Sequence, residues 1–249
     1  MGLFDLFGSK EEREQNQLRK LAKKLTERYG PPENRQKVIE QLGEMATPGA
    51  LGTLCLRFTV RAEPGITDDE EKETARGILV AAGQEALGPV EAFIREQESG
   101  IAWGLRVLAQ VAPPEKVVET VVKELARLSR SYTRDPEKKL VLLTWLAEHA
   151  GPEADAGLEA ALLPLLEDFS DDVRIGAARV LSGRAPSEPA RDALIQLLLR
   201  DRDNARVRGE VLETLARLGA DVKGHRPSVE ALLVEPFYLD REGRVKKRG

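Results

Sequence analysis

The chain has 249 residues and a net charge of −4, from 38 basic and 42 acidic side chains. This balance gives no overall positive field for nucleic acid. A single cysteine, Cys55, excludes an internal disulfide and a multi-cysteine metal site. Aromatic residues make up only 4%, whereas leucine and alanine are plentiful, which favours helices over a β-sandwich.

Apolar residues recur at helical spacing from about residue 10 onward. We expect helices at 17–29, 34–45 and 50–60, and the same rhythm continues to about residue 233. The breaks between helices contain Pro, Gly or Asp, and one of them is expected at Leu87-Gly88-Pro89. The pattern predicts an all-α protein built from many short helices.

Two segments near the end of this region share a pattern. Val173-Arg174 follows Asp172, and Val207-Arg208 lies 34 residues further on. The pattern resembles the HEAT-repeat family, in which the second helix of each pair often begins in this way. Arg35 occupies the arginine position in an earlier segment. The resemblance extends over roughly residues 15–233 and implies a right-handed α-solenoid of about six HEAT-like helix pairs, of bacterial type.

The resemblance also implies a role for the arginines of these second helices. Arg174 and Arg208 are expected to pair with aspartates of adjacent repeats, forming a ladder. Three other arginines are free to contact a partner and are predicted binding residues: Arg179, Arg206 and Arg217. The available aspartates are Asp168, Asp171, Asp172, Asp201 and Asp203.

We expect three parts: an N-terminal segment (1–14), a repeat domain (15–234) and a basic tail (235–249). The tail is predicted to form a small hairpin around Gly243 or to be frayed. No stretch reaches the ~20 apolar residues of a membrane span. The first ten residues do not resemble a secretory signal, so a cytoplasmic location is expected.

The N-terminal segment places four large apolar side chains on one helical face, at Leu3, Phe4, Leu6 and Phe7. Burying them fully would contribute roughly 6–12 kcal/mol before ordering costs. Three interpretations stay open. The segment caps the first repeat or is disordered, docks on a partner protein, or binds weakly to a membrane at its inner face.

Catalysis has little support in the sequence. The chain has two histidines, His149 and His225, and lacks a Gly-rich phosphate loop, a His-Glu-x-x-His motif and a Cys-x-x-Cys motif. We therefore expect no enzyme activity, no cofactor and no bound metal. Trp103 and Trp145 are the only tryptophans, and they serve either the core or a binding surface.

The function predicted from these features is that of a protein-binding scaffold. Its second helices would form a concave face that holds a segment of a partner protein, because stacked repeats present many side chains along one surface. Two alternatives come from similar folds. One is a nucleic-acid-acting protein similar to the bacterial alkylpurine DNA glycosylases, although no nucleic acid is expected here. The other is an enzyme similar to the bilin lyases.

Overall fold

A computed structural model describes residues 10–130, 134–151, 156–184 and 187–248. Leu3, Phe4, Leu6 and Phe7 lie outside these ranges. The chain forms two compact units, one ending at Val117 and one beginning at Val118, and each is described by itself.

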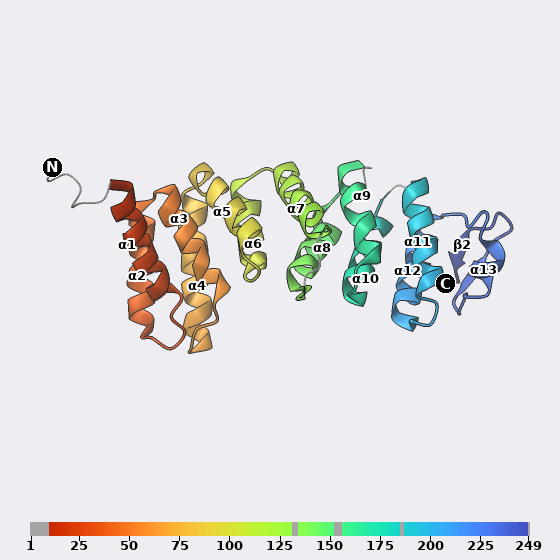
Figure 1. Cartoon of the computed structure of the whole chain (residues 1–249), viewed down its shortest axis with the longest axis horizontal. Helices are drawn as coiled ribbons and strands as arrows, with labels where there is room; N and C mark the ends of the chain where they lie inside the picture. The colour runs from red at the N-terminus through yellow and green to blue at the C-terminus, as the bar shows by residue number, and fades with distance from the viewer. Residues whose placement is uncertain (1–9, 131–133, 152–155, 185–186, 249) are drawn as a thin grey trace, which may run out of the picture. The chain divides into compact units, whose positions relative to one another are not determined.

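The first unit consists of antiparallel helix pairs arranged in two layers (Figure 1). The first helices of the pairs, α1, α3 and α5, pack against one another, as do the second helices α2, α4 and α6. The short 3₁₀ helix η2 continues α3. The elements are α1 (Lys10–Leu25), α2 (Pro32–Met45), α3 (Pro48–Cys55), η2 (Leu56–Thr59), α4 (Gly65–Ala81), α5 (Gln84–Glu96) and α6 (Ile101–Val111).

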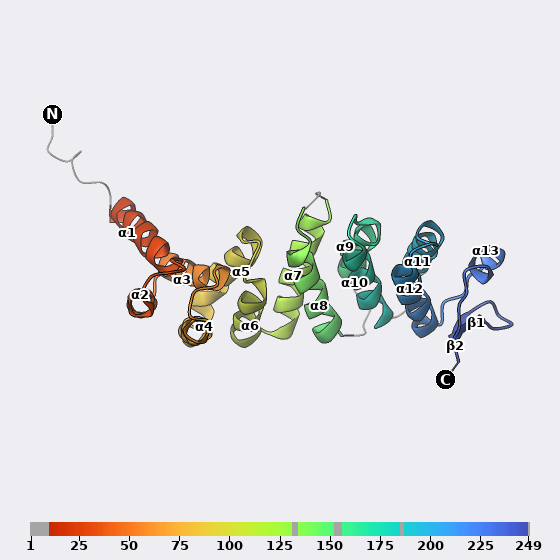
Figure 2. The same cartoon turned by 90° about the horizontal axis from the view of Figure 1, so that it is seen from below.

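The second unit repeats the arrangement, and α7 enters it from the first unit. Here α10 packs between α8 and α12, so these three second helices lie side by side (Figures 1 and 2). The elements are α7 (Pro114–Leu128), α8 (Glu137–His149), α9 (Ala156–Leu162), η3 (Leu163–Glu167), α10 (Asp171–Ser182), α11 (Glu188–Arg200), α12 (Ala205–Leu218), α13 (Arg226–Glu230), β1 (Phe237–Leu239) and β2 (Val245–Lys247).

Local capping explains where several helices begin. The side chains of Thr47, Ser170, Ser187 and Asn204 each accept a hydrogen bond from a backbone N–H in the first turn of the following helix. These bonds satisfy donors that a helix start leaves unpaired. The helices α2, α3 and α7 start with a proline, which has no N–H to satisfy.

The break expected at Leu87-Gly88-Pro89 is wrong. The preceding helix ends earlier, and α5 starts directly after Gly83, which has a φ of +56°. Pro89 lies inside α5, where its missing N–H removes one helical hydrogen bond. The helix continues because its apolar face is fully packed, with Val90 and Ile94 completely buried.

The end of the chain forms the hairpin that was one of two predicted outcomes. Strands β1 and β2 are antiparallel, with Leu239 opposite Val245, and Gly243 between them has a φ of +77°. An all-α repeat fold is confirmed, since the six expected helix pairs can be followed through the described residues. The handedness of the stack and the three-part division of the chain stay predictions. Across the described ranges, every helix falls short of the length and apolar character that a membrane crossing requires.

Candidate functional site

The second helices of the C-terminal unit form a surface groove. It lies between α8 and α10, has a volume of about 460 Å³, and reaches Arg206 on α12. Its floor is apolar, with Leu143 buried and Leu140 and Ile175 half-buried. Thr144, on its wall, is exposed. The groove is therefore an accessible apolar surface with polar walls, which suits a binding site.

A glycine accounts for the closeness of the two helices beneath this groove. Gly176 of α10 faces α8, and a Cβ atom at this position would lie 3.0 Å from Cδ1 of Leu143. Glycine costs about 1 kcal/mol inside a helix relative to alanine, so packing is the benefit that offsets it here. The side chain of Leu143 therefore packs directly against Gly176, where any larger residue would press on it.

Two predicted binding residues, Arg179 and Arg206, line the groove. Nη2 of Arg179 lies 2.7 Å from Oε2 of Glu210, and Nη2 of Arg206 lies 2.5 Å from Oδ1 of Asp172. Both ion pairs join α10 to α12. The hydrogen bond from Arg179 to Glu210 raises the pKa of the arginine, against the opposing effect of partial burial. The two arginine side chains stay 57% and 66% exposed.

The other predicted residues do not join this site. Arg217 pairs with Glu213 at 3.1 Å within α12 and does not line the groove. Trp145 is half-buried and stacks on His149 with ring centroids 4.5 Å apart, outside the groove. Trp103 lies in the first unit, where it stacks on Phe58 at 5.6 Å.

The predicted arginine ladder is present at Arg174. Its Nε lies 2.8 Å from Oδ2 of Asp201, in the next repeat. A second rung is formed by a lysine, since Nζ of Lys139 lies 2.7 Å from Oδ2 of Asp168. Hydrogen bonding from Asn204, together with Arg174, lowers the pKa of Asp171 despite some burial.

The expected rung at Arg208 is absent from the described residues. Its Nη1 instead donates to the carbonyl oxygen of Arg202 at 2.7 Å. Arg174 makes a matching contact, with Nη1 donating to the carbonyl of Asp168 at 2.6 Å. The repeating feature is therefore a guanidinium that braces the turn before its own helix, and a carboxylate from the next repeat joins it where one is available.

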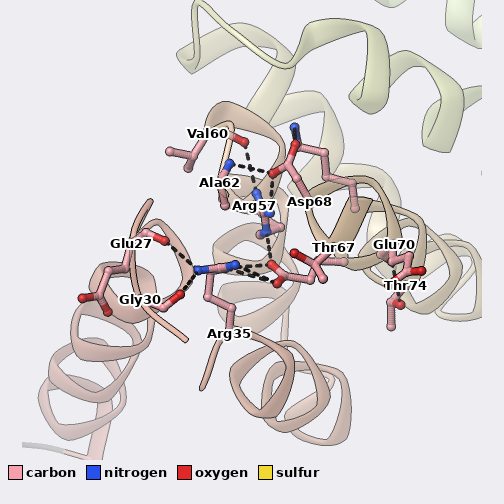
Figure 3. A network of polar contacts seen from close by, with 12 residues as sticks. Glu27, Gly30, Arg35, Arg57, Val60, Ala62, Thr67, Asp68, Glu70 and Thr74 are labelled. Carbon is pink, nitrogen blue, oxygen red and sulfur yellow. Dashed lines mark hydrogen bonds and ion pairs between the residues drawn. The ribbon is translucent and has the colours of Figure 1, made fainter. Parts of the chain in front are cut away.

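The first unit contains a larger buried version of this arrangement (Figure 3). Glu71 of α4 accepts hydrogen bonds from Nε of Arg35 at 2.9 Å and from Nε of Arg57 at 2.8 Å. Asp68, one turn earlier, accepts from Nη2 of Arg57 at 2.5 Å and from Nζ of Lys72 at 2.7 Å. All five side chains are at most 10% exposed. We call them the buried ion network.

The cysteine and one of the two histidines have surroundings that indicate a structural role. Cys55 is fully buried, and burial raises the pKa of its thiol to about 12. His149 ends α8, and its Nδ1 lies 2.9 Å from the carbonyl oxygen of Trp145. Within the described ranges, no group of three or more His, Cys, Asp or Glu side chains is placed to hold a metal ion.

Sequence reasoning missed part of the groove. Its walls include Thr144, Ala147 and Glu148 of α8, none of which was predicted. Gly176 was the available signal, because a glycine inside a strongly predicted helix indicates a close approach of another element. The partner helix in that approach was not evident from local sequence.

A comparison with protein families agrees with the repeat fold for part of the chain. Residues 159–245 match the model of a family described as HEAT repeats, which confirms the resemblance for this part of the chain. A search of curated proteins finds no match. Among solved structures, the crystal structure of an engineered protein is 21% identical with a TM-score of 0.39, covering 82% of this chain and 96% of that chain. Neither the DNA glycosylase nor the bilin lyase alternative gains support.

Proposed function

We propose that this helical-repeat protein is a non-enzymatic scaffold that binds a segment of a partner protein along α8, α10 and α12. The observation that carries the proposal is the groove of about 460 Å³ between α8 and α10, with its apolar floor and charged rim. Helical-repeat proteins use surfaces of this kind for binding because adjacent repeats present continuous rows of side chains.

The floor of the groove supplies the apolar part of the interaction. A segment that covers Leu140, Leu143 and Ile175 removes apolar surface from water, at about 25 cal/mol per Å². The exposed Thr144 and Ala147 offer little steric obstruction. The groove therefore accepts a row of apolar side chains from an amphipathic segment.

The charged rim of the groove, which includes Arg179 and Arg206, supplies the polar part of the interaction. Exposed ion pairs such as Arg206–Asp172 contribute about 0–1 kcal/mol, so exchanging their partners costs little. A carboxylate on the arriving segment would replace Asp172 as the partner of Arg206, or join Glu210 as a second partner of Arg179. The expected ligand is an amphipathic protein segment with an acidic side chain next to its apolar face.

The N-terminal segment has a separate part in this proposal. Leu3, Phe4, Leu6 and Phe7 would tether the scaffold to the partner or to the inner face of a membrane, in the cytoplasm. Its apolar face supports this role. A chain lacking residues 2–9 tests the tether independently of the groove.

The groove is tested by affinity capture from the native lysate with three forms of the full chain. The wild type is compared with Ala147→Arg, which fills the groove from an exposed position, and with Ala160→Arg, at an exposed alanine of α9. We expect the wild type and Ala160→Arg to retain the same stoichiometric protein and Ala147→Arg to lose it. A photo-crosslinking residue at Thr144 should then join the chain to that protein.

Two outcomes contradict the proposal. One is equal retention of the partner by Ala147→Arg and Ala160→Arg, which would place the binding surface elsewhere. The other is the absence of any stoichiometric protein from the wild-type eluate. Thermal unfolding of each variant must match the wild type, so that loss of the partner reports the groove and not loss of the fold.

A further inference from the structure

A second hollow lies in the first unit, where two turns meet. The turn after α1 carries Arg28 and Tyr29, and the turn between η2 and α4 carries Arg61. The N–H of Glu63 donates to the carbonyl oxygen of Arg28 at 3.1 Å and joins the turns. Between them is a hollow of about 560 Å³, lined by residues 28–29 and 61–65. We call it the arginine hollow.

The buried ion network holds the first of these turns. Nη1 of Arg35 donates to the carbonyl oxygens of Glu27 at 3.2 Å and Gly30 at 2.7 Å. Glu27 and Gly30, both labelled in Figure 3, come directly before and after Arg28-Tyr29 in the chain. Arg35 therefore fixes the backbone that carries the exposed side chains of Arg28 and Tyr29.

The same network holds the second turn. Nη1 of Arg57 donates to the carbonyl oxygen of Val60 at 3.1 Å, and the N–H of Ala62 donates to Oδ1 of Asp68 at 2.8 Å. Val60 and Ala62, both labelled in Figure 3, are the chain neighbours of Arg61. Since Glu71 accepts from both Arg35 and Arg57, a single carboxylate links the supports of the two turns. A surface fixed in this way loses little conformational entropy on binding.

The charges of the hollow favour an anion. Arg28 and Arg61 are exposed, and neither forms an ion pair within the part of the chain that the structure describes. They are opposed in the lining by one carboxylate, Glu63. Beneath them, the buried ion network holds three cations against two carboxylates. The lining contributes a net charge of +1 and the network another +1, although the whole chain is acidic.

One large, exposed apolar side chain lines the hollow, and another follows the last lining residue in the chain. Tyr29 is 82% exposed, and Ile66, next to the lining residue Gly65, is 78% exposed. Tyrosine and arginine are enriched among the residues that dominate protein interfaces. Since a free anion gains nothing from exposed apolar side chains, the combination favours a protein segment.

We propose that the arginine hollow binds an acidic segment of a protein. Carboxylates of the segment pair with Arg28 and Arg61, each of which can form two parallel hydrogen bonds to one carboxylate. An apolar side chain of the segment packs against Tyr29 and Ile66. This site lies in the first unit and is separate from the groove of the second, so either can fail without the other.

The test measures how tightly the full chain binds a fluorescein-labelled peptide in which glutamates surround a leucine. Binding is measured by fluorescence anisotropy at low salt. The double variant Arg28→Gln/Arg61→Gln should weaken binding by roughly 10-fold or more. The control Arg19→Gln/Lys20→Gln removes the same charge from exposed positions of α1, outside the hollow, and should weaken it by less than about 2-fold. Tyr29→Ala should also weaken binding, without a change in charge.

The outcomes distinguish binding at the arginine hollow from a general attraction between the acidic peptide and basic side chains. Equal weakening by the two double variants, or no saturable binding by the wild type, would overturn the proposal. If inorganic phosphate displaces the labelled peptide at the same concentration as unlabelled peptide does, the hollow binds small anions. That result would also overturn the proposal. All substituted residues are exposed and outside the buried ion network, so a variant that unfolds early would be unexpected and is checked by thermal melting.

Discussion

Arg35 and Glu71 form a buried ion pair with two parallel contacts, Nε to Oε2 at 2.9 Å and Nη2 to Oε1 at 3.0 Å. The two residues lie 36 positions apart and join α2 to α4. Burying such a pair gains little compared with apolar packing, because both charges lose their water. Removing one partner destabilises the protein, because the remaining charge is then buried without compensation.

Glu71→Gln is expected to lower the free energy of unfolding of the first unit by about 3–5 kcal/mol, because Arg35 and Arg57 lose a shared carboxylate. Trp103 fluorescence during urea unfolding, in a Trp145→Phe background, places the probe in this unit. The matched control is Glu73→Gln, whose carboxylate is 50% exposed, with an expected change below about 1 kcal/mol. Equal effects of the two substitutions would contradict the prediction.

Asp201→Asn tests the ladder of the second unit. The side chains of Asp201 and Arg174 are only 12% and 11% exposed, so the loss of charge is expected to cost about 1–3 kcal/mol. Urea unfolding followed by Trp145 fluorescence, with Trp103 replaced by Phe, reports the change. Asp203→Asn serves as the control, because that side chain is 96% exposed. A neutral result for Asp201→Asn would show that the rung adds no stability.

Acid is expected to weaken the first unit through Asp68. Burial raises the pKa of this carboxyl, but hydrogen bonds from Lys72, the Ala62 amide and Arg57 lower it by more, to below its usual 3.8. A lowered pKa in the folded state means that the stabilisation is complete above about pH 5 and is lost as the pH falls through the folded value.

The measurement is the free energy of unfolding of the wild type and of Asp68→Asn between about pH 7 and pH 3. The wild type should be more stable at neutral pH, and its advantage should shrink in the acid range. A difference that stays constant down to the lowest pH would show that Asp68 does not titrate with unfolding.

The thiol of Cys55 should be inert in the folded protein. Its pKa of about 12 leaves almost no thiolate at pH 8, and the side chain is fully buried. Reaction with a thiol-specific reagent should therefore be negligible under native conditions and rapid in concentrated urea. Rapid native labelling would contradict the prediction and show that the packing around α3 opens.

The helix pairs were predictable because their signals are local. The start of α2 at Pro32 was predictable because proline suits the first turn of a helix, whereas α1 ends at Leu25, before the stop expected at Gly30. The Arg174–Asp201 pair was also foreseen, from a family pattern that repeats along the chain. Pro89 shows the limit of such signals, since the burial of Val90 and Ile94 outweighs the local cost of a proline inside α5.

The two candidate surfaces depend on contacts between distant residues, which leave little trace in sequence. Nothing near Arg57 indicates that it meets a carboxylate at position 71 inside the protein. Likewise, Arg28 and Arg61 come together only because two turns, 33 residues apart, are tied by one backbone hydrogen bond. The groove beside Gly176 depends on how closely α8 and α10 approach each other.

The hairpin has a consequence for self-association. Strand β2 packs against α12 and α13 packs against α11, on the side where another helix pair would otherwise stack. Val245 is fully buried there, and Lys247 lies 2.9 Å from Glu213 of α12. A helix pair left uncovered would offer its apolar side to the matching side of another molecule. Two short strands and one helical turn cover that side of α11 and α12, so the apolar side chains beneath them are not available for packing against another molecule.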